Sequence, residues 1–409
     1  MTSSPKNPPP AAVLIPAARL LSPLGNDATE TLLRLARPGS FPDEAALGRV
    51  PESFLEAARR TADDLGVPEK ERTRTLLFTL HMIRPLVRRA LDAGVGPAEI
   101  GFVFGGTAAG TPEVVEGLRT RPEAAPEEKW RLLEIGRTAP AAARILGICG
   151  PVITVSTACT AGAKAIAEGA RLLRTGFVKA VVAGGLDVLS PLTEAGFSAL
   201  GARSAERAKP FRADRSGLHL GEGGGFLLMT TDAERFPDAP VVLAGTGETS
   251  DAHHICAPEP EGRGAAEAVS LALGGRAPES VGFALLHGTA TPQNDAMEAK
   301  ALAQVLPGVP AASLKRSVGH QLAGAGAFNA AVAWAMLTTP GGCPAVPANF
   351  EEAPGAEPDP ALPDMVRRAL TRADQPAELR HPAVVASAFA FGGSNAALLF
   401  EARLPNTRK

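Results

Sequence analysis

The sequence predicts a layered α/β fold. From about residue 150 onward, short β-branched or apolar runs alternate with helical segments rich in Ala and Gly, the order that produces a sheet covered by helices. The 409 residues are 45% hydrophobic and 21% charged, which is typical of a globular protein. This length is too great for one small core and indicates two closely packed units or a duplicated fold.

The start of the chain predicts a core strand and no membrane anchor. The apolar run 11–21 is short and broken by Pro16, so we expect a first strand and not a signal peptide. No stretch of roughly 20 apolar residues occurs. Four cysteines are too sparse for a disulfide framework and form no C-x-x-C pair. We therefore expect reduced thiols and a cytoplasmic protein that does not span a membrane.

The first third of the chain is predicted to be helix-rich and charged. Asp27 or Thr29 could cap a helix over 31–36. Residues 69–94 alternate apolar and basic positions at helical spacing, and Pro85 marks an expected kink or break.

The rest of the chain predicts a regular alternation of strands and helices. Helices over 161–173 and 322–336 consist largely of small residues, which allows close approach, so we place them inside, between layers. Residues 257–264 and 339–363 are expected to form surface loops. Strands are expected at residues 152–156, 179–183, 225–230, 241–245, 283–286, 384–389 and 396–400.

The composition restricts the chemistry. The chain contains no Tyr, so any mechanism that depends on a phenol is excluded. A net charge of −2 offers no basic field for nucleic acid or an acidic membrane, and the few Phe and Trp make base stacking improbable. The reactive groups must come from 4 Cys, 7 His, the carboxylates, Lys, Ser and Thr.

The sharpest local motif surrounds Cys159 in TVSTACTAG, residues 154–162. A β-branched run ends in a tight turn, and the cysteine lies where the next helix starts. The N–H groups and partial positive charge at a helix start favour thiolate, which would make Cys159 a nucleophile near neutral pH. The alternative is a buried structural cysteine, the commoner fate of a free Cys.

Two histidines and a glycine turn lie in further motifs. His287 ends an apolar strand in LLHGTATP, at the rim where α/β folds bind ligands, although a hydrogen-bonded loop histidine is equally plausible from this motif by itself. His320, in KRSVGHQLAGAG, precedes a helix so depleted of bulk that another segment must approach it closely. In FAFGGSN, residues 389–395, the glycine N–H groups could form an anion nest.

Other patterns predict neither a metal nor a cofactor. Asp251, His253, His254 and Cys256 do not have a standard ligand spacing. Residues 221–225 lack the G-x-G-x-x-G pattern and precede a strand, so a dinucleotide site is not expected. The chain has no G-x-x-x-x-G-K-[ST] motif and no G-x-S-x-G motif, and the second absence argues against an α/β-hydrolase.

Taken together, these motifs resemble the β-ketoacyl-[acyl carrier protein] synthases of the elongating type, members of the thiolase-like superfamily. The resemblance covers roughly residues 12 to 403 and is strong after 150. The motifs stand in the family's order as TACTAG around Cys159, VVAGGLDVLSPL at 181–192, PFRADRSGLHLGEGGG at 210–225, SDAHH at 250–254, HGTATPQND at 287–295, KRSVGH at 315–320 and FAFGGSN at 389–395.

The resemblance implies the thiolase fold. Two similar α/β halves, each with a five-stranded mixed sheet, would stack into five layers, α-β-α-β-α. The first half, 1–238, would carry the nucleophilic Cys, and the second, 239–409, both histidines. A dimer is implied, with the strand before the cysteine, or its neighbour, paired across the two-fold axis.

The implied activity is decarboxylative Claisen condensation of an acyl-enzyme with malonyl-acyl carrier protein, in fatty-acid or polyketide elongation. Cys159 would attack the acyl thioester, and the N–H groups of Cys159 and Phe391 would form the oxyanion hole. His287 and His320 would hydrogen-bond the malonyl thioester carbonyl. No cofactor is implied beyond the phosphopantetheine of the carrier protein.

Further site residues follow from the same resemblance. Lys315 would order the site, and Glu298 would support it. Thr289 and Thr291 would hydrogen-bond the phosphopantetheine arm. Phe391 would be the aromatic gate between the malonyl site and the acyl pocket.

Some features separate this chain from its neighbours in the superfamily. Initiating synthases carry Asn where His320 stands, and chain-length factors usually lack the cysteine present here. A non-condensing, chain-length-factor-like partner of a heterodimeric synthase remains the alternative. Ala390 replaces the usual Gly of the gate loop, which would restrict the gate and suggests a secondary-metabolite synthase.

The partner is expected to be an acidic acyl carrier protein, bound by a homodimer or by a heterodimer with a related subunit. A basic patch should then exist at the tunnel mouth despite the net charge of −2. A solvated loop is the alternative interpretation. The candidates are Arg203, Arg207, Lys209 and Arg212.

Overall fold

The computed structural model describes residues 11–36, 48–120, 130–339, 343, 346–350, 356–375 and 377–403. Ten strands form one mixed sheet, flanked by helices. The strands are β1 (Val13–Leu21), β2 (Ile100–Gly105), β3 (Val152–Val155), β4 (Ala180–Asp187), β5 (Gly223–Thr230), β6 (Val241–Ser250), β7 (Phe283–Leu286), β8 (Ala311–Ser313), β9 (Ala383–Ala390) and β10 (Ser394–Ala402).

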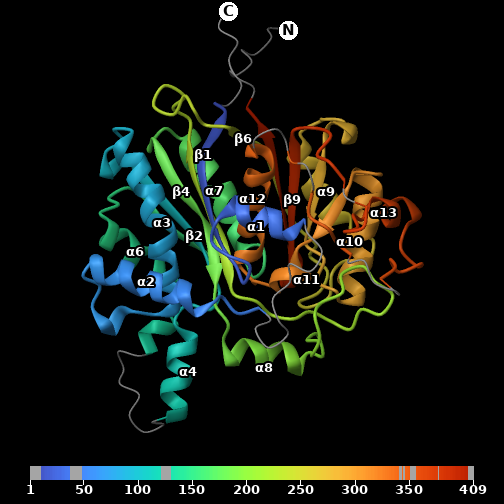
Figure 1. The fold of residues 1–409 in the computed structure, drawn as a ribbon, viewed down its shortest axis with the longest axis horizontal. Coiled ribbons are helices and arrows are strands. Elements are labelled where there is room, and N and C mark those ends of the chain that lie inside the picture. The colour runs from blue at the N-terminus through green and yellow to red at the C-terminus, as the bar shows by residue number, and fades with distance from the viewer. Residues whose placement is uncertain are drawn as a thin grey trace, which may run out of the picture.

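The helices form three layers around the two parts of this sheet (Figure 1). One outer layer contains α2, α3 and α6, the central layer contains α7 and α12, and the other outer layer contains α9, α10 and α13. The α-helices are α1 (Ala28–Leu35), α2 (Glu52–Asp64), α3 (Arg74–Asp92), α4 (Thr111–Thr120), α6 (Thr138–Leu146), α7 (Ala161–Arg174), α8 (Pro191–Ala199), α9 (Arg263–Leu273), α10 (Pro292–Val305), α11 (Lys315–Val318), α12 (Gly324–Thr338) and α13 (Asp364–Ala369).

The strand order repeats within the chain. It runs β3-β2-β4-β5-β1 and then, in mirrored order, β6-β10-β9-β7-β8. In the first block β2 is parallel to β3 and β4, while β5 is antiparallel to β4 and β1. In the second block β7 and β10 have the same relations to their neighbours. The predicted α/β fold of thiolase type is confirmed, and the repeat supports the boundary at 238/239, which stays a prediction.

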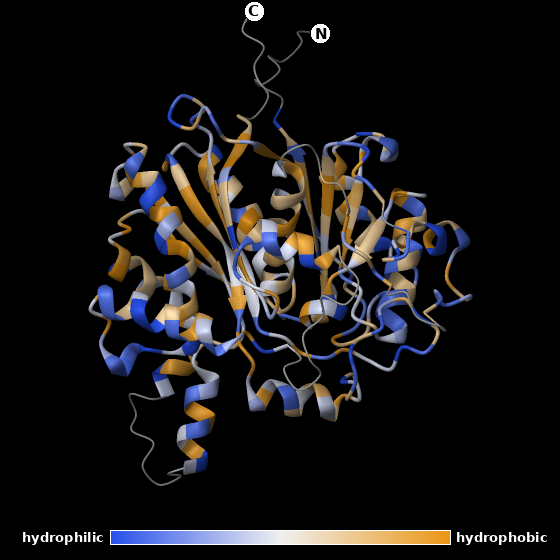
Figure 2. Cartoon of the chain, viewed as in Figure 1, coloured by the Kyte–Doolittle hydropathy of each residue, from blue (hydrophilic) through white to orange (hydrophobic). Residues whose placement is uncertain are grey.

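The two blocks are joined through the antiparallel pair of β1 and β6. The expectation of two five-stranded sheets therefore needs a correction, because three residue pairs, beginning with Val13 and Leu243, make the sheet continuous. Figure 2 shows apolar residues concentrated on the strands, whereas the outer helices carry hydrophilic faces. No helix in the described part of the chain is long and apolar enough to cross a membrane.

The central helices α7 and α12 lie very close together, as their small residues predict. A Cβ added at Gly162 would lie 2.5 Å from the carbonyl oxygen of Ala323, and one at Gly326 would lie 2.9 Å from the Cβ of Ala163. Such distances leave no space for any side chain. Because Cys159 precedes α7 and His320 precedes α12, this packing brings their two loops together.

The first third of the chain tests two predictions made from the sequence, the helix cap at Asp27 and the effect of Pro85. Asp27 caps α1 by accepting a hydrogen bond from the Glu30 N–H at 2.7 Å. Of the kink or break predicted at Pro85, the break is wrong, because helix α3 continues through this residue. Buried apolar residues on both sides of Pro85 pack into the same core cluster. Proline is also present in β1, where the pairing with β5 shifts register beside Pro16, as expected of a residue that cannot donate to the ladder.

The two predicted loops have different outcomes. The segment 257–264 is irregular until α9 begins at Arg263. The stretch 339–363 lies partly outside the described residues, and its described part contains no strand or helix. Strands β2 and β8 were not among the predicted strands.

Candidate active site

Cys159 lies in a tight connection between β3 and α7, as its motif predicts. The preceding residue, Ala158, has a φ of 51°, a left-handed conformation that costs a non-glycine residue energy and persists only when its surroundings impose it. The turn places the Cys159 side chain in a cavity that His287 and His320 also line. Cys159 itself is buried.

The structure brings together the three residues that the motifs single out. Nε2 of His320 lies 3.1 Å from Sγ of Cys159. The rings of His287 and His320 are 5.3 Å apart between centroids and nearly perpendicular, at 85°. Cys159 comes from the first block of strands and both histidines come from the second, so the site lies at the junction between them.

Burial changes the expected protonation state of the cysteine. It raises the pKa of the Cys159 thiol to about 12, although the nearby Lys315 ammonium acts in the opposite direction. The prediction of a thiolate near neutral pH is therefore wrong for the resting site, because the position at a helix start does not offset the loss of solvation. The thiol needs a base when it reacts, and His320 is in place to accept its proton.

Lys315 sets the orientation of His287. Its Nζ lies 3.3 Å from Nδ1 of His287 and also donates to the His287 carbonyl oxygen. An ammonium group can only donate, so Nδ1 accepts and the ring proton is on Nε2. Burial, together with Lys315, holds the pKa of His287 well below its usual value, and the same two causes act on His320. Both imidazoles are neutral.

Glu298 holds the backbone of the His287 loop. Its two carboxylate oxygens accept the N–H groups of His287 at 2.7 Å and Gly288 at 2.6 Å, and Ser387 donates to it at 3.3 Å. Burial raises the pKa of Glu298 and lowers the pKa of Lys315, while the opposite charge of each partner acts against both shifts. Glu298 thus acts on the site through the backbone of His287.

Thr289 and Thr291 line the same cavity, with their hydroxyl oxygens 2.9 Å apart. The residue between them, Ala290, has a φ of 63°. Asp295 fixes this conformation by accepting the Ala290 N–H at 3.1 Å and the Phe211 N–H at 2.7 Å. Sequence reasoning missed Asp295, although it is the last residue of the HGTATPQND motif and its burial raises its pKa to about 6.

The cavity has a volume of about 220 Å³ and a largely apolar wall beyond the reactive groups. At its edge the ring of Phe391 stacks on Phe197, with centroids 5.8 Å apart. Ala390 is extended, with φ −134° and ψ 160°, which any residue adopts, so alanine causes no strain in this state. The roles of Phe391 as gate and oxyanion-hole donor stay predictions.

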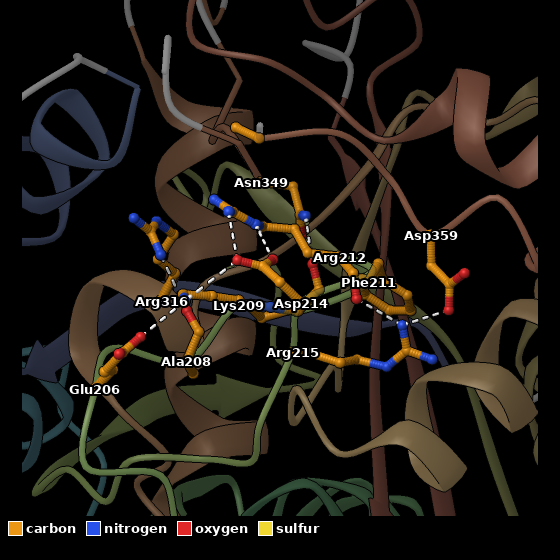
Figure 3. Close-up of polar contacts among 12 residues, drawn as sticks. Glu206, Ala208, Lys209, Phe211, Arg212, Asp214, Arg215, Arg316, Asn349 and Asp359 are labelled. Atoms are coloured by element: carbon orange, nitrogen blue, oxygen red, sulfur yellow. Dashed lines mark hydrogen bonds and ion pairs between the residues drawn. The ribbon is translucent and has the colours of Figure 1, made fainter. Parts of the chain in front are cut away.

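Acidic groups compensate most of the predicted basic patch (Figure 3). Lys209 contacts Glu206 at 2.7 Å and Asp214 at 3.2 Å. Arg212 also pairs with Asp214, at 2.7 Å. Arg203 has Glu194 at 3.7 Å. The loop therefore offers much less free positive charge than its count of cations suggests.

Two polar residues of the 251–256 segment, Asp251 and His254, make hydrogen bonds with the surrounding chain. Asp251 accepts from Nδ2 of Asn395 at 2.7 Å, and Nδ1 of His254 accepts the N–H groups of Cys256 and Ala257. Among the described residues, no group of three or more His, Cys, Asp or Glu side chains could hold a metal ion.

A duplicated α/β fold with a cysteine and two histidines in one cavity, between the two blocks of strands, defines a thiolase-like protein. Residues 42–235 match the family model for the beta-ketoacyl synthase N-terminal domain, and residues 241–345 match the model for its C-terminal domain. The chain belongs to the beta-ketoacyl synthase family.

Curated relatives and solved structures agree with this assignment. The chain is 34% identical over 272 residues to 3-oxoacyl-[acyl-carrier-protein] synthase 2 of Synechocystis sp., over 63% of this chain and 62% of that protein. It is 36% identical over 230 residues to the tetracenomycin polyketide synthase ketoacyl synthase alpha subunit of Streptomyces glaucescens, 52% of each chain. The matched regions thus span about half to six tenths of these relatives.

A structural match extends over nearly the whole chain. A chain from the complex of the ketosynthase ApeO with its chain length factor ApeC, from Xenorhabdus doucetiae, gives a TM-score of 0.79 at 31% identity and covers 98% of this chain and 100% of that chain. A beta-ketoacyl synthase from Burkholderia phymatum has the same fold, with a TM-score of 0.77 at 22% identity.

Proposed function

We propose that this chain catalyses the decarboxylative condensation of an acyl group with malonyl-acyl carrier protein, giving a β-ketoacyl-carrier protein. The observation that carries the proposal is the Cys159 Sγ at 3.1 Å from a neutral His320, with His287 in the same cavity. The names of the curated relatives, a 3-oxoacyl-[acyl-carrier-protein] synthase and a polyketide ketoacyl synthase, support this reaction in fatty-acid or polyketide elongation.

In the first half-reaction Cys159 takes the acyl group. As Sγ attacks the thioester carbonyl, its proton passes to Nε2 of His320 and then to the departing phosphopantetheine thiolate. The C–S bond to the carrier breaks as the new C–S bond to Cys159 forms. The N–H groups of Cys159 and Phe391 would stabilise the tetrahedral oxyanion.

In the second half-reaction the malonyl thioester loses carbon dioxide. The C–C bond to the carboxylate breaks, and its electron pair forms an enolate on the thioester oxygen. Nε2 of His287, whose proton is fixed by Lys315, would donate to that oxygen, and so would Nε2 of His320 once its neutral ring has taken the other tautomer from the one that accepts the Cys159 proton. Each donor would contribute about 3 kcal/mol, the usual size for one oxyanion donor. The enolate carbon then attacks the acyl-enzyme and releases the Cys159 thiolate.

Acyl carrier protein and a second synthase subunit are the proposed partners. Strand β3 is at one edge of the sheet and its residues are only half buried, which supports pairing with another subunit across a two-fold axis. The complex of ApeO with its chain length factor supports a heterodimer, and a homodimer is the other form of the proposal. The free state of all four cysteines supports a reducing, cytoplasmic setting.

The proposal is tested by incubating the purified chain with acyl-carrier protein and malonyl-carrier protein. We expect β-ketoacyl-carrier protein and carbon dioxide in equal amounts, from this chain alone or after addition of its partner subunit. The non-condensing alternative predicts product only with a separate ketosynthase. It also predicts that the Cys159→Ala variant of this chain supports the same rate in that mixture.

The rate of decarboxylation is expected to fall as pH rises through about 8. Burial lowers the pKa of Lys315 to about 8. Above this value its ammonium loses the charge that holds Nδ1 of His287. Initial rates of carbon dioxide release between pH 6 and pH 10, with a fixed concentration of malonyl-carrier protein, measure the effect. An unchanged rate up to pH 10 would contradict this role of Lys315.

A further inference from the structure

A fully buried carboxylate outside the predicted set of site residues lies at the junction of the two central helices. Asp187 is the last residue of β4 and has no exposed surface. It accepts four hydrogen bonds: from the Thr107 N–H at 2.9 Å, the Thr107 hydroxyl at 2.5 Å, the Ala108 N–H at 2.8 Å and the Ala323 N–H at 3.0 Å. The three peptide N–H groups can only donate, so both oxygens of Asp187 accept, as those of a carboxylate do. Burial raises the pKa of Asp187, and these hydrogen bonds act in the opposite direction.

These hydrogen bonds connect the two loops that carry the reacting groups. Ala323 lies three residues after His320, and its carbonyl oxygen accepts the N–H of Gly162 at 3.0 Å. Gly162 lies three residues after Cys159. A continuous series of hydrogen bonds therefore connects the Asp187 carboxylate, through the N–H and carbonyl groups of Ala323, to the first turn of α7.

Both loops contain a strained residue. Ala158, directly before Cys159, has a φ of 51°, and Leu322, directly before Ala323, has a φ of 48°. Such conformations persist only when surrounding contacts impose them. The bond from Asp187 to Ala323 is placed where it can hold the second of these turns.

The packing around Asp187 leaves little freedom for another arrangement. Gly185, two residues earlier, faces the same side of β4. A Cβ at Gly185 would lie 2.8 Å from the Gly105 carbonyl oxygen, 2.8 Å from the Gly162 Cα and 3.1 Å from the Ala323 carbonyl oxygen. Three backbone segments thus pack tightly against the end of β4, and Asp187 accepts hydrogen bonds from two of them.

We propose that Asp187 is a positioning residue, which holds the Cys159 and His320 loops in the register that the acyl-transfer step requires. The proposal rests on the proposed function for the identity of that step. The negative charge of Asp187 also contributes to the raised pKa of the Cys159 thiol. Loss of this charge should therefore change the pH profile of thiol alkylation, whereas a disturbed register should change the rate of acyl transfer.

The test compares Asp187→Asn with Thr107→Val. The second variant removes only the hydroxyl donor and keeps the three hydrogen bonds from peptide N–H groups to the carboxylate. The pH profile of Cys159 alkylation by iodoacetamide reports the thiol without any carrier protein. The rate of acyl transfer from acyl-carrier protein reports the register. Thermal unfolding reports the folded fraction, by which both rates are corrected.

For Asp187→Asn we expect the alkylation midpoint to move to lower pH while acyl transfer slows about 100-fold, the usual cost of a displacement near 1 Å. Thr107→Val should stay within about tenfold of wild type in acyl transfer and keep its alkylation midpoint. An Asp187→Asn variant with the wild-type midpoint and wild-type transfer would overturn the proposal. So would losses that only follow the folded fraction.

Asp187→Glu keeps the carboxylate and is used if the Asn variant does not fold. It should keep the alkylation midpoint and slow acyl transfer at least tenfold; wild-type transfer would overturn the proposal. If wild-type protein accepts no acyl group, the proposed function fails. Asp187 is then judged on the alkylation profile of the Asp187→Asn variant. Where that variant does not fold, the Asp187→Glu profile is used instead. In either variant, alkylation at the wild-type rate at every pH overturns the positioning role.

Discussion

The Cys159→Ala variant is expected to gain no acyl group and to lose condensation by a factor on the order of 10⁶, the size of loss seen when a catalytic nucleophile is removed. The residue places a sulfur directly against a base, with Sγ at 3.1 Å from Nε2 of His320. Intact-protein mass spectrometry after incubation with acyl-carrier protein measures the first effect. A chromatographic assay of β-ketoacyl product measures the second.

Cys256→Ala is the matched control, because Cys256 lines the same cavity and is exposed to solvent. We expect it to gain the acyl mass at the wild-type rate. An acyl mass on Cys159→Ala, or its loss from Cys256→Ala, would contradict the assignment of the nucleophile.

The second large effect is a separation of the two half-reactions by the two histidines. His287→Ala is expected to keep acylation of Cys159 and to lose decarboxylation by roughly 10²–10³-fold, the cost of one oxyanion donor. His320→Ala should impair both steps, since its Nε2 contacts Sγ directly. Acyl mass on the enzyme and carbon dioxide release from labelled malonyl-carrier protein are measured on the same samples.

A conservative variant separates the loss of a donor from a disturbed site. Removal of the His287 ring leaves the buried Lys315 without the Nδ1 acceptor, which costs stability in its own right. His287→Gln keeps a side-chain amide and should recover part of the decarboxylation rate. Equal slowing of acylation and decarboxylation in both His287 variants would contradict the division of roles.

The sequence predicted the site better than it predicted the chemistry of its atoms. Cys159, His287 and His320 each follow a strand or loop end, and such ends meet at one edge of an α/β fold, so their convergence could be expected. The resting thiol could not, because the pKa of Cys159 depends on burial, which is produced by segments distant in the chain. The same limit applies to Asp295, whose partner Phe211 is 84 residues away.

The fold shows a similar division between local and distant causes. The small residues of α7 and α12 predicted their central position, since a helix without bulk can pack only against a close neighbour. Of the kink or break predicted at Pro85, the break was wrong because tertiary packing of α3 outweighs a local preference. Pairing of β1 with β6 had no local signal at all.

A single-turnover experiment tests whether one thiol links the two half-reactions. Cys159 is first loaded with an acyl group and freed of excess acyl-carrier protein, and labelled malonyl-carrier protein is then added. The acyl mass should leave the enzyme at the same rate as carbon dioxide and β-ketoacyl-carrier protein appear, in a ratio of about 1:1:1, which follows from the bonds broken and formed in the proposed step. Carbon dioxide release without loss of the acyl group, or product from an enzyme that carries no acyl group, would contradict condensation at Cys159.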